Sequence, residues 1–248
     1  MDGINKLNAA SAGPLSGHVA LVTGGSRGIG KAIASKLAQL GAAVSICARN
    51  VQALEKTAAD LSAAGATVHS QALDVTDDRQ VKTLVETTEK ELGPVTILVN
   101  NAGIGNPGFG PIHEKSEDDW QRVLDTNLKS VFLVSKAVVP SMIARRRGEI
   151  IHISSLAGKN TFAGGGIYCA SKWGLQGLAG CMAEDLRGFG IRVTLVCPGS
   201  VATEFSGTLK DPSKVLTPED VAHAVSMIVL EGPQSFISEV QLRPVAKP

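Results

Sequence analysis

The sequence is poor in the residues that mark disulfide scaffolds, metal centres and membrane spans. Its cysteines have no CxxC spacing and are too sparse for a disulfide framework; they are Cys47, Cys169, Cys181 and Cys197. The five histidines form no HxxxH or HExxH pair, so a catalytic metal has little support. No apolar run reaches membrane-spanning length, and the N-terminus lacks a cationic segment followed by an apolar one. These absences favour a cytoplasmic protein without a metal or a membrane partner.

Charge of either sign is balanced, and aromatic side chains are scarce. The formal net charge of +1 gives no basis for expecting a nucleic acid or an anionic membrane as a partner. Aromatic residues make up 4% of the chain and include a single tyrosine, Tyr168. The hydrophobic fraction of 44% is that of a globular protein. The core must therefore consist mainly of aliphatic side chains, a composition that suits a parallel sheet covered by helices.

Apolar runs alternate with segments of helical periodicity from residue 17 onward. The apolar runs predict strands over 18–24, 42–49, 67–75, 95–103, 149–155, 191–199 and 238–244. Helical spacing predicts helices over 30–41, 51–65, 78–93, 118–148 (with a candidate kink at Pro140), 166–190 and 217–230. This alternation is typical of the α/β class and predicts one doubly wound Rossmann domain over 17–248, with about seven parallel strands and helices on both faces. Residues 1–16 are expected to form a flexible leader.

A glycine-rich segment lies between the first expected strand and the first expected helix. It reads VTGGSRGIGKAI and contains Gly24, Gly25, Gly28 and Gly30. Glycines permit the backbone angles of a tight turn, and their missing Cβ atoms let a pyrophosphate approach a helix N-terminus. The position between a strand and a helix favours dinucleotide binding over a plain connecting turn.

Four motifs occur in order: the T-G-x-x-x-G-x-G turn, NNAG at Asn100–Gly103, Tyr168-x-x-x-Lys172, and PGSVAT at Pro198–Thr203. Together they resemble the short-chain dehydrogenase/reductase family, and the resemblance extends over nearly the whole chain. Asp74 and Val75 of this chain match the positions that flank the adenine of the bound cofactor in members of that family. The resemblance implies a nicotinamide cofactor bound by Gly24, Ser26, Arg27, Gly28, Ile29, Gly30, Arg49, Asp74, Val75, Asn101, Ala102, Gly103, Tyr168, Lys172, Pro198, Gly199, Val201 and Thr203.

The end of the second expected strand distinguishes between the two nicotinamide cofactors. A cofactor with a free ribose 2′-hydroxyl usually meets a carboxylate there, but this chain has Ala48 followed by Arg49. Arg27 lies within the glycine turn. Two guanidinium groups without a carboxylate favour charge-assisted bonds to a 2′-phosphate. We therefore predict NADP(H) rather than NAD(H); the alternative is that one or both arginines are solvated surface residues.

Tyr168 and Lys172 are four residues apart and share one face of an expected helix. A free phenol has a pKa of about 10, and a nearby ammonium group is expected to lower it and to make Tyr168 a tuned acid or base. The family resemblance adds Ser155, with Ser154 as its neighbour, as the residue that binds the substrate oxygen. It also adds Asn127, which in that family holds a water that relays protons to the lysine. It implies hydride transfer between NADPH and a carbonyl carbon, with Tyr168 as the proton donor.

The resemblance implies a small carbonyl or alcohol substrate. Many family members of this size reduce 3-oxoacyl thioesters, as 3-oxoacyl-[acyl-carrier-protein] reductases do, and this is the leading expectation. The C-terminus reads ISEVQLRPVAKP, without the DGG common in those reductases, so sugar, polyol, steroid and xenobiotic carbonyl substrates remain alternatives. A catalytically silent NADP(H)-sensing protein is a further alternative. Phe109, Phe162 and Phe205 are candidate substrate walls or loop anchors. The family also implies a homodimer or homotetramer that associates through the helix at 166–190 and the long helix before it.

Overall fold

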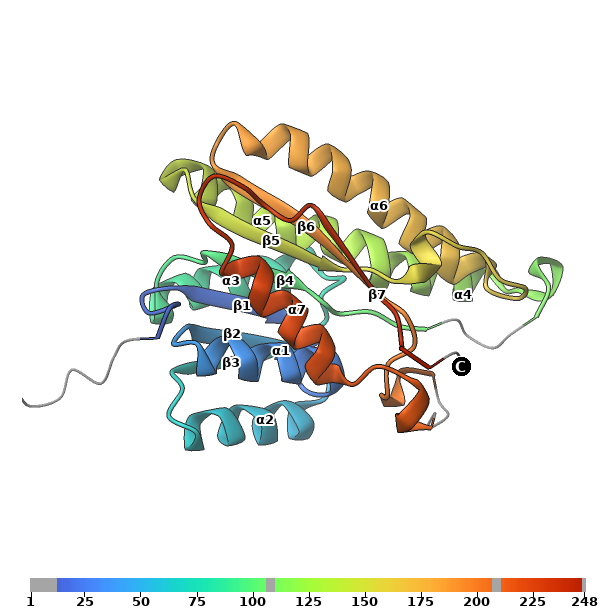
Figure 1. Ribbon diagram of the computed structural model, residues 1–248, viewed down its shortest axis with the longest axis horizontal. Helices are drawn as coiled ribbons and strands as arrows, with labels where there is room; N and C mark the ends of the chain where they lie inside the picture. The colour runs from blue at the N-terminus through green and yellow to red at the C-terminus, as the bar shows by residue number, and fades with distance from the viewer. Residues whose placement is uncertain (1–12, 106–109, 207–210, 247–248) are drawn as a thin grey trace, which may run out of the picture.

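The computed structural model describes residues 13–105, 110–206 and 211–246. Within these residues, seven parallel strands form one sheet in the order β3-β2-β1-β4-β5-β6-β7 (Figure 1). The strands are β1 (Val19–Thr23), β2 (Ala43–Ala48), β3 (Val68–Ala72), β4 (Ile97–Asn100), β5 (Gly148–Ile153), β6 (Ile191–Pro198) and β7 (Glu239–Leu242). The predicted doubly wound parallel sheet is confirmed.

Helices alternate with the strands. The α-helices are α1 (Gly28–Gln39), α2 (Val51–Ala63), α3 (Asp78–Leu92), α4 (Glu117–Leu124), α5 (Ser130–Arg145), α6 (Gly166–Arg187) and α7 (Pro218–Val229). A π-helical turn, η2 (Asp125–Lys129), joins α4 to α5. Short 3₁₀ turns are η1 (Ile112–Glu114), η3 (Leu156–Gly158), η4 (Glu204–Ser206) and η5 (Pro212–Lys214).

Two hydrophobic layers, one on each face of the sheet, form the core. Residues of α3, α5 and α6 belong to one layer, and residues of α1, α2 and α7 belong to the other. Figure 1 shows α6 on the far side of the sheet from α1 and α2. In β1, Val19 and Leu21 join the first layer, whereas Ala20 and Val22 join the second. Because strand side chains alternate between faces, a strand covered on both sides is apolar at nearly every position.

Polar side chains set the starts of several helices. Asn50 accepts a hydrogen bond from the Ala53 N–H at the start of α2, and Asp77 accepts two at the start of α3. Thr217 and Asp220 form a reciprocal capping box at the start of α7. These caps satisfy backbone N–H groups that have no partner within the helix, which explains why the helices begin where they do.

The helical region expected over 118–148 is interrupted at η2, not at Pro140. Within η2 the backbone bonds span one residue more than in an α-helix, and the Ser130 N–H donates to the Asp125 carbonyl. Pro140 lies inside α5, whose helical conformation continues to Arg145. A π turn inserts a residue without any helix-breaking side chain, so the spacing of apolar residues gives no warning of it.

The continuous stretch Glu117–Arg145 is long and apolar enough to cross a membrane by length and composition, and its most apolar window of 18 residues has a mean hydropathy of 1.2. No such segment is expected from the sequence, because polar and charged residues interrupt this stretch and no continuous apolar run in it reaches membrane-spanning length. In the structure 44% of the most apolar window is buried, and residues of α5 such as Val131, Val134 and Val138 pack against the sheet. Core helices have these same properties, so the stretch is weak evidence for a membrane partner.

The N-terminal leader expected over 1–16 falls partly on residues 1–12, which lie outside the described residues. Residues 13–16 pack against the end of α1, where the Leu15 N–H donates to the Leu40 carbonyl at 2.9 Å. The Leu15 side chain is only 2% exposed and belongs to the layer formed by α1, α2 and α7. The packed part of the protein therefore already includes Leu15, which precedes the expected boundary.

Candidate active site

A cleft of about 1550 Å³ opens at the carboxyl ends of the strands. It lies where the strand order reverses between β1 and β4, which is where doubly wound sheets bind ligands. Among the predicted catalytic residues, Ser155, Tyr168 and Lys172 line the cleft, whereas Asn127 does not. All predicted cofactor-binding residues line it: Gly24, Ser26, Arg27, Gly28, Ile29, Gly30, Arg49, Asp74, Val75, Asn101, Ala102, Gly103, Tyr168, Lys172, Pro198, Gly199, Val201 and Thr203.

The turn between β1 and α1 requires glycine for two different reasons. Gly24 and Gly28 have φ angles of 67° and 53°, in the left-handed region that other residues rarely adopt. Gly30 has no room for a side chain, because its Cβ would stand 2.2 Å from the Gly24 carbonyl oxygen. Arg27 occupies the N-cap of α1 without capping it through its side chain. The turn and the uncapped N-terminus together fit a phosphate-bearing ligand.

Asn101 ties the glycine turn to the neighbouring strand end. Its Nδ2 donates to the carbonyls of Thr23 at 2.9 Å and Gly24 at 3.3 Å. The Thr23 Oγ1 in turn accepts from the N–H groups of Asn101 and Ala102, both at 3.0 Å. These bonds join β1 to the segment after β4, as the resemblance of NNAG to a sheet-stabilising motif implies.

One end of the cleft carries the two arginines expected to recognise a 2′-phosphate. Arg49 follows β2 and is exposed. Arg27 is exposed too, but its Nη1 lies 2.5 Å from Glu204 Oε2. The sequence-based view that no carboxylate lies near these arginines is therefore wrong for Arg27. The reason is that Glu204 comes from the segment after β6, 177 residues further along the chain.

Asp74 and Val75 lie at the same end, after β3. Asp74 Oδ1 accepts bonds from the Thr76 N–H at 2.9 Å and the Thr76 hydroxyl at 2.8 Å, which fixes a turn. The Val75 side chain is 7% exposed and belongs to the layer of α3, α5 and α6. Both residues thus form a rigid wall of the cleft.

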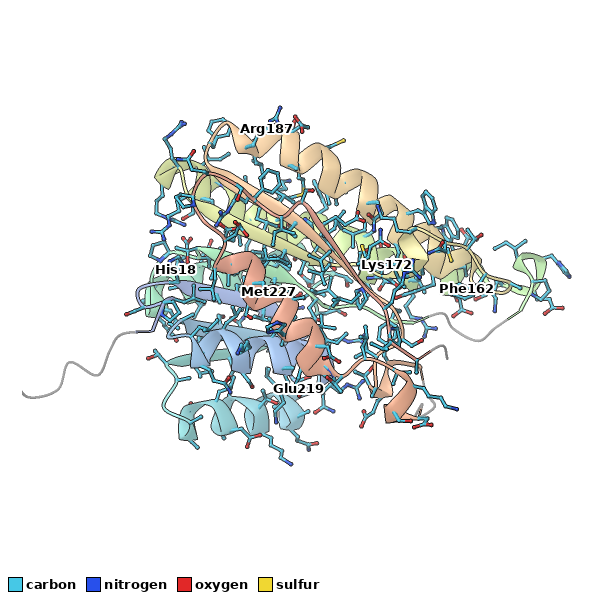
Figure 2. The ribbon with its side chains drawn as sticks, viewed as in Figure 1. His18, Phe162, Lys172, Arg187, Glu219 and Met227 are labelled. Carbon is cyan, nitrogen blue, oxygen red and sulfur yellow. The ribbon has the colours of Figure 1, made fainter. Side chains whose placement is uncertain are left out.

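Tyr168 and Lys172 occupy successive turns of α6 in the middle of the cleft. Lys172 is only 5% exposed, and its Nζ donates to the Ile153 carbonyl at 3.0 Å. Figure 2 shows Lys172 close to the carboxyl end of the sheet, with Phe162 farther out. The Lys172 Nζ lies 5.9 Å from the centre of the Tyr168 ring. The predicted juxtaposition of a phenol and an ammonium group is therefore present.

The two serines after β5 take different partners. Ser155 forms a side-chain hydrogen bond with Tyr168, and its Oγ also accepts from the Ala157 N–H at 3.1 Å. Ser154 instead accepts from Gln176 Nε2 at 2.9 Å and is buried. This geometry distinguishes Ser155 from Ser154, because only Ser155 is hydrogen-bonded to the Tyr168 phenol.

The electrostatics of the pair differ from the sequence-based expectation. Burial raises the pKa of Tyr168 to about 12, although the hydrogen bond from Ser155 opposes the shift. Burial lowers the pKa of Lys172 to about 8. The expected lowering of the tyrosine pKa by the ammonium group is therefore not found in the protein alone. Withdrawal from water disfavours both charged forms and outweighs their mutual attraction.

Asn127 lies in η2 and connects two walls of the site. Its Oδ1 accepts from the Ile104 N–H at 2.8 Å, and its Nδ2 donates to the Ile104 carbonyl and to Ser171 Oγ. Ser171 Oγ donates to the Tyr168 carbonyl at 2.7 Å. Both N–H groups of the amide are thus used within the protein. These contacts make Asn127 a positioning residue that holds the loop after β4 against α6.

The segment after β6 closes one side of the cleft. The Gly199 N–H donates to the Leu242 carbonyl at 2.8 Å, and Val201 forms a bridge with Leu216. Thr203 approaches the glycine turn, since a Cβ on Gly28 would stand 3.2 Å from its Cγ2. This segment therefore spans from the sheet to the turn that precedes α1.

Aromatic and basic side chains form further walls of the cleft. Phe162 and Phe205 both line it, whereas Phe109 lies outside the described residues. The Phe205 ring meets the Tyr168 ring edge-on at 6.1 Å between centres. Arg243, which sequence analysis did not single out, also lines the cleft, is exposed, and has no ion pair with any described residue. It lies within the expected last strand, 238–244, directly after Leu242.

Neither a metal cluster nor a disulfide is found in the part of the chain that the structure describes. No group of three or more histidine, cysteine or carboxylate side chains is placed to hold a metal ion there. The cysteines are all free thiols: Cys47, Cys169 and Cys197 are buried, and Cys181 is exposed. Cys169, beside the tyrosine, is packed inside the protein, with its sulfur 3.8 Å from the Asn160 carbonyl.

A family model described as short chain dehydrogenase matches residues 18–214. The 3-oxoacyl-[acyl-carrier-protein] reductase of Haemophilus influenzae is 38% identical over 200 residues, which cover 81% of each protein. The glycine betaine reductase of Emericella nidulans is 39% identical over 254 residues; the match covers 98% of this chain but 20% of that protein.

Solved structures agree with these sequence matches. A metagenomic short-chain oxidoreductase in complex with NADP is 44% identical and superposes with a TM-score of 0.84. The match covers 94% of this chain and 99% of that one. The structural similarity therefore extends over nearly the whole chain.

The single tyrosine allows the ionisation of the site to be observed directly. Because the folded pKa is about 12 and the unfolded value is about 10, the native state binds more protons between these pH values. We expect the near-ultraviolet tyrosinate signal of the native protein to appear well above pH 10, and to shift down to about pH 10 in denaturant. The contribution of Tyr168 to stability should be present below pH 10 and be lost as pH rises toward 12. A native midpoint equal to the denatured one would contradict the burial argument.

Proposed function

The chain belongs to the short-chain dehydrogenase family, and we propose that it is an NADP(H)-dependent oxidoreductase that transfers a hydride between the cofactor and a carbonyl or alcohol substrate. The observation that carries this proposal is the convergence of Ser155, Tyr168 and Lys172 in the same cleft as the glycine turn. A catalytically silent cofactor sensor has no need for a phenol bonded to a serine at this place.

The cleft has the features that an NADP(H) site requires. The glycine turn and the uncapped start of α1 are suited to the pyrophosphate, and Arg27 and Arg49 are suited to the 2′-phosphate. The NADP complex of the metagenomic relative supports the same choice of cofactor. When bound, the nicotinamide supplies or accepts the hydride.

The side chains of the protein control the proton. Tyr168 remains protonated at neutral pH because its pKa is about 12, so it is ready to give its proton to a carbonyl oxygen. Ser155 lowers the pKa of Tyr168, which fits a hydroxyl that donates toward the phenol oxygen. Its single O–H can turn to donate to a substrate oxygen instead. Ser155 thereby stabilises the charge that develops as the proton leaves.

Lys172 holds its ammonium group at the floor of the cleft. One of its N–H groups is used by the Ile153 carbonyl, which fixes the side chain in place. We propose that the remaining N–H groups bind the nicotinamide ribose and that the positive charge favours the phenolate of Tyr168. Its pKa of about 8 leaves it mostly charged at neutral pH, so the charge is available when the phenol ionises.

For the substrate, we propose a 3-oxoacyl thioester. The similarity to the Haemophilus influenzae reductase supports this class. Arg243 at the rim, without an ion-pair partner among the described residues, suits a phosphate on the carrier of such a thioester. Phe162 and Phe205 offer apolar surface for an acyl chain. The competing class consists of neutral sugar, polyol, steroid or xenobiotic carbonyls, which gain nothing from a cation at the rim.

We also propose that the protein acts in the cytoplasm as a homodimer or homotetramer. Large apolar side chains remain exposed on α4, α5 and α6, namely Trp120, Phe132 and Trp173. Gly177 and Gly180 on α6 would let another helix approach, because a Cβ on either has no atom within 4 Å.

Sedimentation equilibrium should give two or four times the monomer mass. Introduction of Phe132→Glu should shift the protein toward the monomer, and a monomeric unaltered protein would contradict this assembly.

Removal of the phenol oxygen separates cofactor binding from chemistry. In Tyr168→Phe, we expect the NADPH dissociation constant to stay nearly unchanged, while turnover falls about 10²–10⁴-fold because the proton donor is lost. Fluorescence titration with NADPH and steady-state NADPH consumption with a panel of ketones check the two parts. Full activity in this variant would overturn the assignment of Tyr168.

Removal of the rim cation distinguishes the two substrate classes. In Arg243→Ala, we expect KM for a 3-oxoacyl coenzyme A thioester to rise about two- to fivefold, because an exposed ion pair contributes little more. KM for a small neutral diketone should stay the same, as should the turnover number for both. Activity on neutral carbonyls but not on thioesters would favour the competing class.

A further inference from the structure

The segment after β6 places a carboxylate opposite the arginine of the glycine turn. Glu204 Oε2 lies 2.5 Å from Arg27 Nη1, and the two side chains are 72% and 71% exposed. Both residues line the cleft. Thr203, next to Glu204, lies against the turn itself, as the short distance from its methyl group to a Cβ on Gly28 shows. Glu204 is therefore paired with the Arg27 guanidinium group, to which a 2′-phosphate is expected to bind.

A carboxylate and a phosphate compete for a guanidinium group on similar terms. Both accept charge-assisted, paired hydrogen bonds, but a phosphate monoester carries more negative charge and more acceptor oxygens. Since both side chains of the Arg27–Glu204 pair are exposed, the pair itself is weak. A phosphate can thus displace Glu204, whereas an uncharged ribose hydroxyl has little advantage over a carboxylate.

We propose that Glu204 is an internal competitor of the 2′-phosphate for Arg27. This inference rests on the proposed NADP(H) function, and it assigns to Glu204 the role of a specificity-determining residue that limits the affinity for the phosphorylated cofactor. Glu204 pairs with the Arg27 guanidinium group again as the phosphate leaves. The competition therefore favours exchange of the spent cofactor, which is required once in every turnover.

Adenosine 2′,5′-bisphosphate and adenosine 5′-monophosphate isolate this end of the cleft, because neither carries a nicotinamide. In Glu204→Gln, isothermal titration at constant ionic strength should show about two- to fivefold tighter binding of the bisphosphate than in the unaltered protein. Binding of the monophosphate should not change. Thermal unfolding should be the same for both proteins, since the removed ion pair is exposed.

Two further variants test whether the effect passes through Arg27. Glu184→Gln also removes one negative charge from an exposed ion pair, with Arg187 at 2.9 Å, but Glu184 does not line the cleft. It should leave the binding of both probes unchanged. In an Arg27→Gln background, Glu204→Gln should no longer tighten binding of the bisphosphate, because the group for which the carboxylate competes is absent.

The outcomes separate this inference from the proposed function. If the unaltered protein prefers the bisphosphate but Glu204→Gln binds it no more tightly, the inference is overturned and the NADP(H) preference stands. Equal tightening for both probes, or tightening that persists without Arg27, would likewise show that Glu204 acts only as a distant charge. If the unaltered protein binds both probes alike, the NADP(H) preference fails, and the inference fails with it.

Discussion

The amide of Asn101 is the contact on which the geometry of the cleft depends. A Cβ on Gly24 would stand 2.9 Å from its Nδ2, and a Cβ on Gly30 would stand 2.5 Å from it. The side chain thus fills the space that two missing Cβ atoms leave, and from there it bonds the carbonyls of Thr23 and Gly24. The glycine turn, the end of β1 and the segment after β4 are held as one unit. Without this contact the glycine turn would lose its link to the segment after β4, and only the pairing of β1 with β4 and the bonds to Thr23 Oγ1 would remain.

Burial is the second constraint, and it acts on the chemistry. α6 carries the half-buried Tyr168 and the buried Lys172 to the inner wall of the cleft, where burial disfavours both the phenolate and the ammonium ion. The protein alone therefore keeps the Tyr168 phenol protonated and leaves Lys172 mostly charged at neutral pH, with both groups in fixed positions. In the proposed function, the charge that tunes the phenol comes from Lys172 together with a bound ligand. The short helix η4 contacts both the glycine turn and the catalytic residues. Its Glu204 contacts Arg27, and its Phe205 contacts Tyr168.

Sequence patterns predicted the parts of this structure that depend on local spacing. Strand and helix positions followed from periodicity, and the glycine turn, Tyr168 and Lys172 lie in one cleft as expected. Ser155, which the family resemblance supplied, lines the same cleft. Three features escaped prediction because each depends on tertiary contacts. Glu204 meets Arg27 across 177 residues, Arg243 is brought to the rim by the pairing of β7 with β6, and the direction of the tyrosine pKa shift depends on burial. The π turn at Asp125–Lys129 escaped for another reason, since it has no characteristic side chain.

That π turn has a consequence for how the chain tolerates change in length. One extra residue in a helical turn rotates everything on its far side by about 100° relative to a continuous α-helix. Val123 in α4 and Val131 in α5 are both buried, so the phase between the two helices is fixed by the inserted residue. Loss of a single residue between Asp125 and Lys129 would turn one of these apolar faces toward solvent. We therefore expect homologous sequences to have no insertions or deletions in this stretch, even where they have point substitutions.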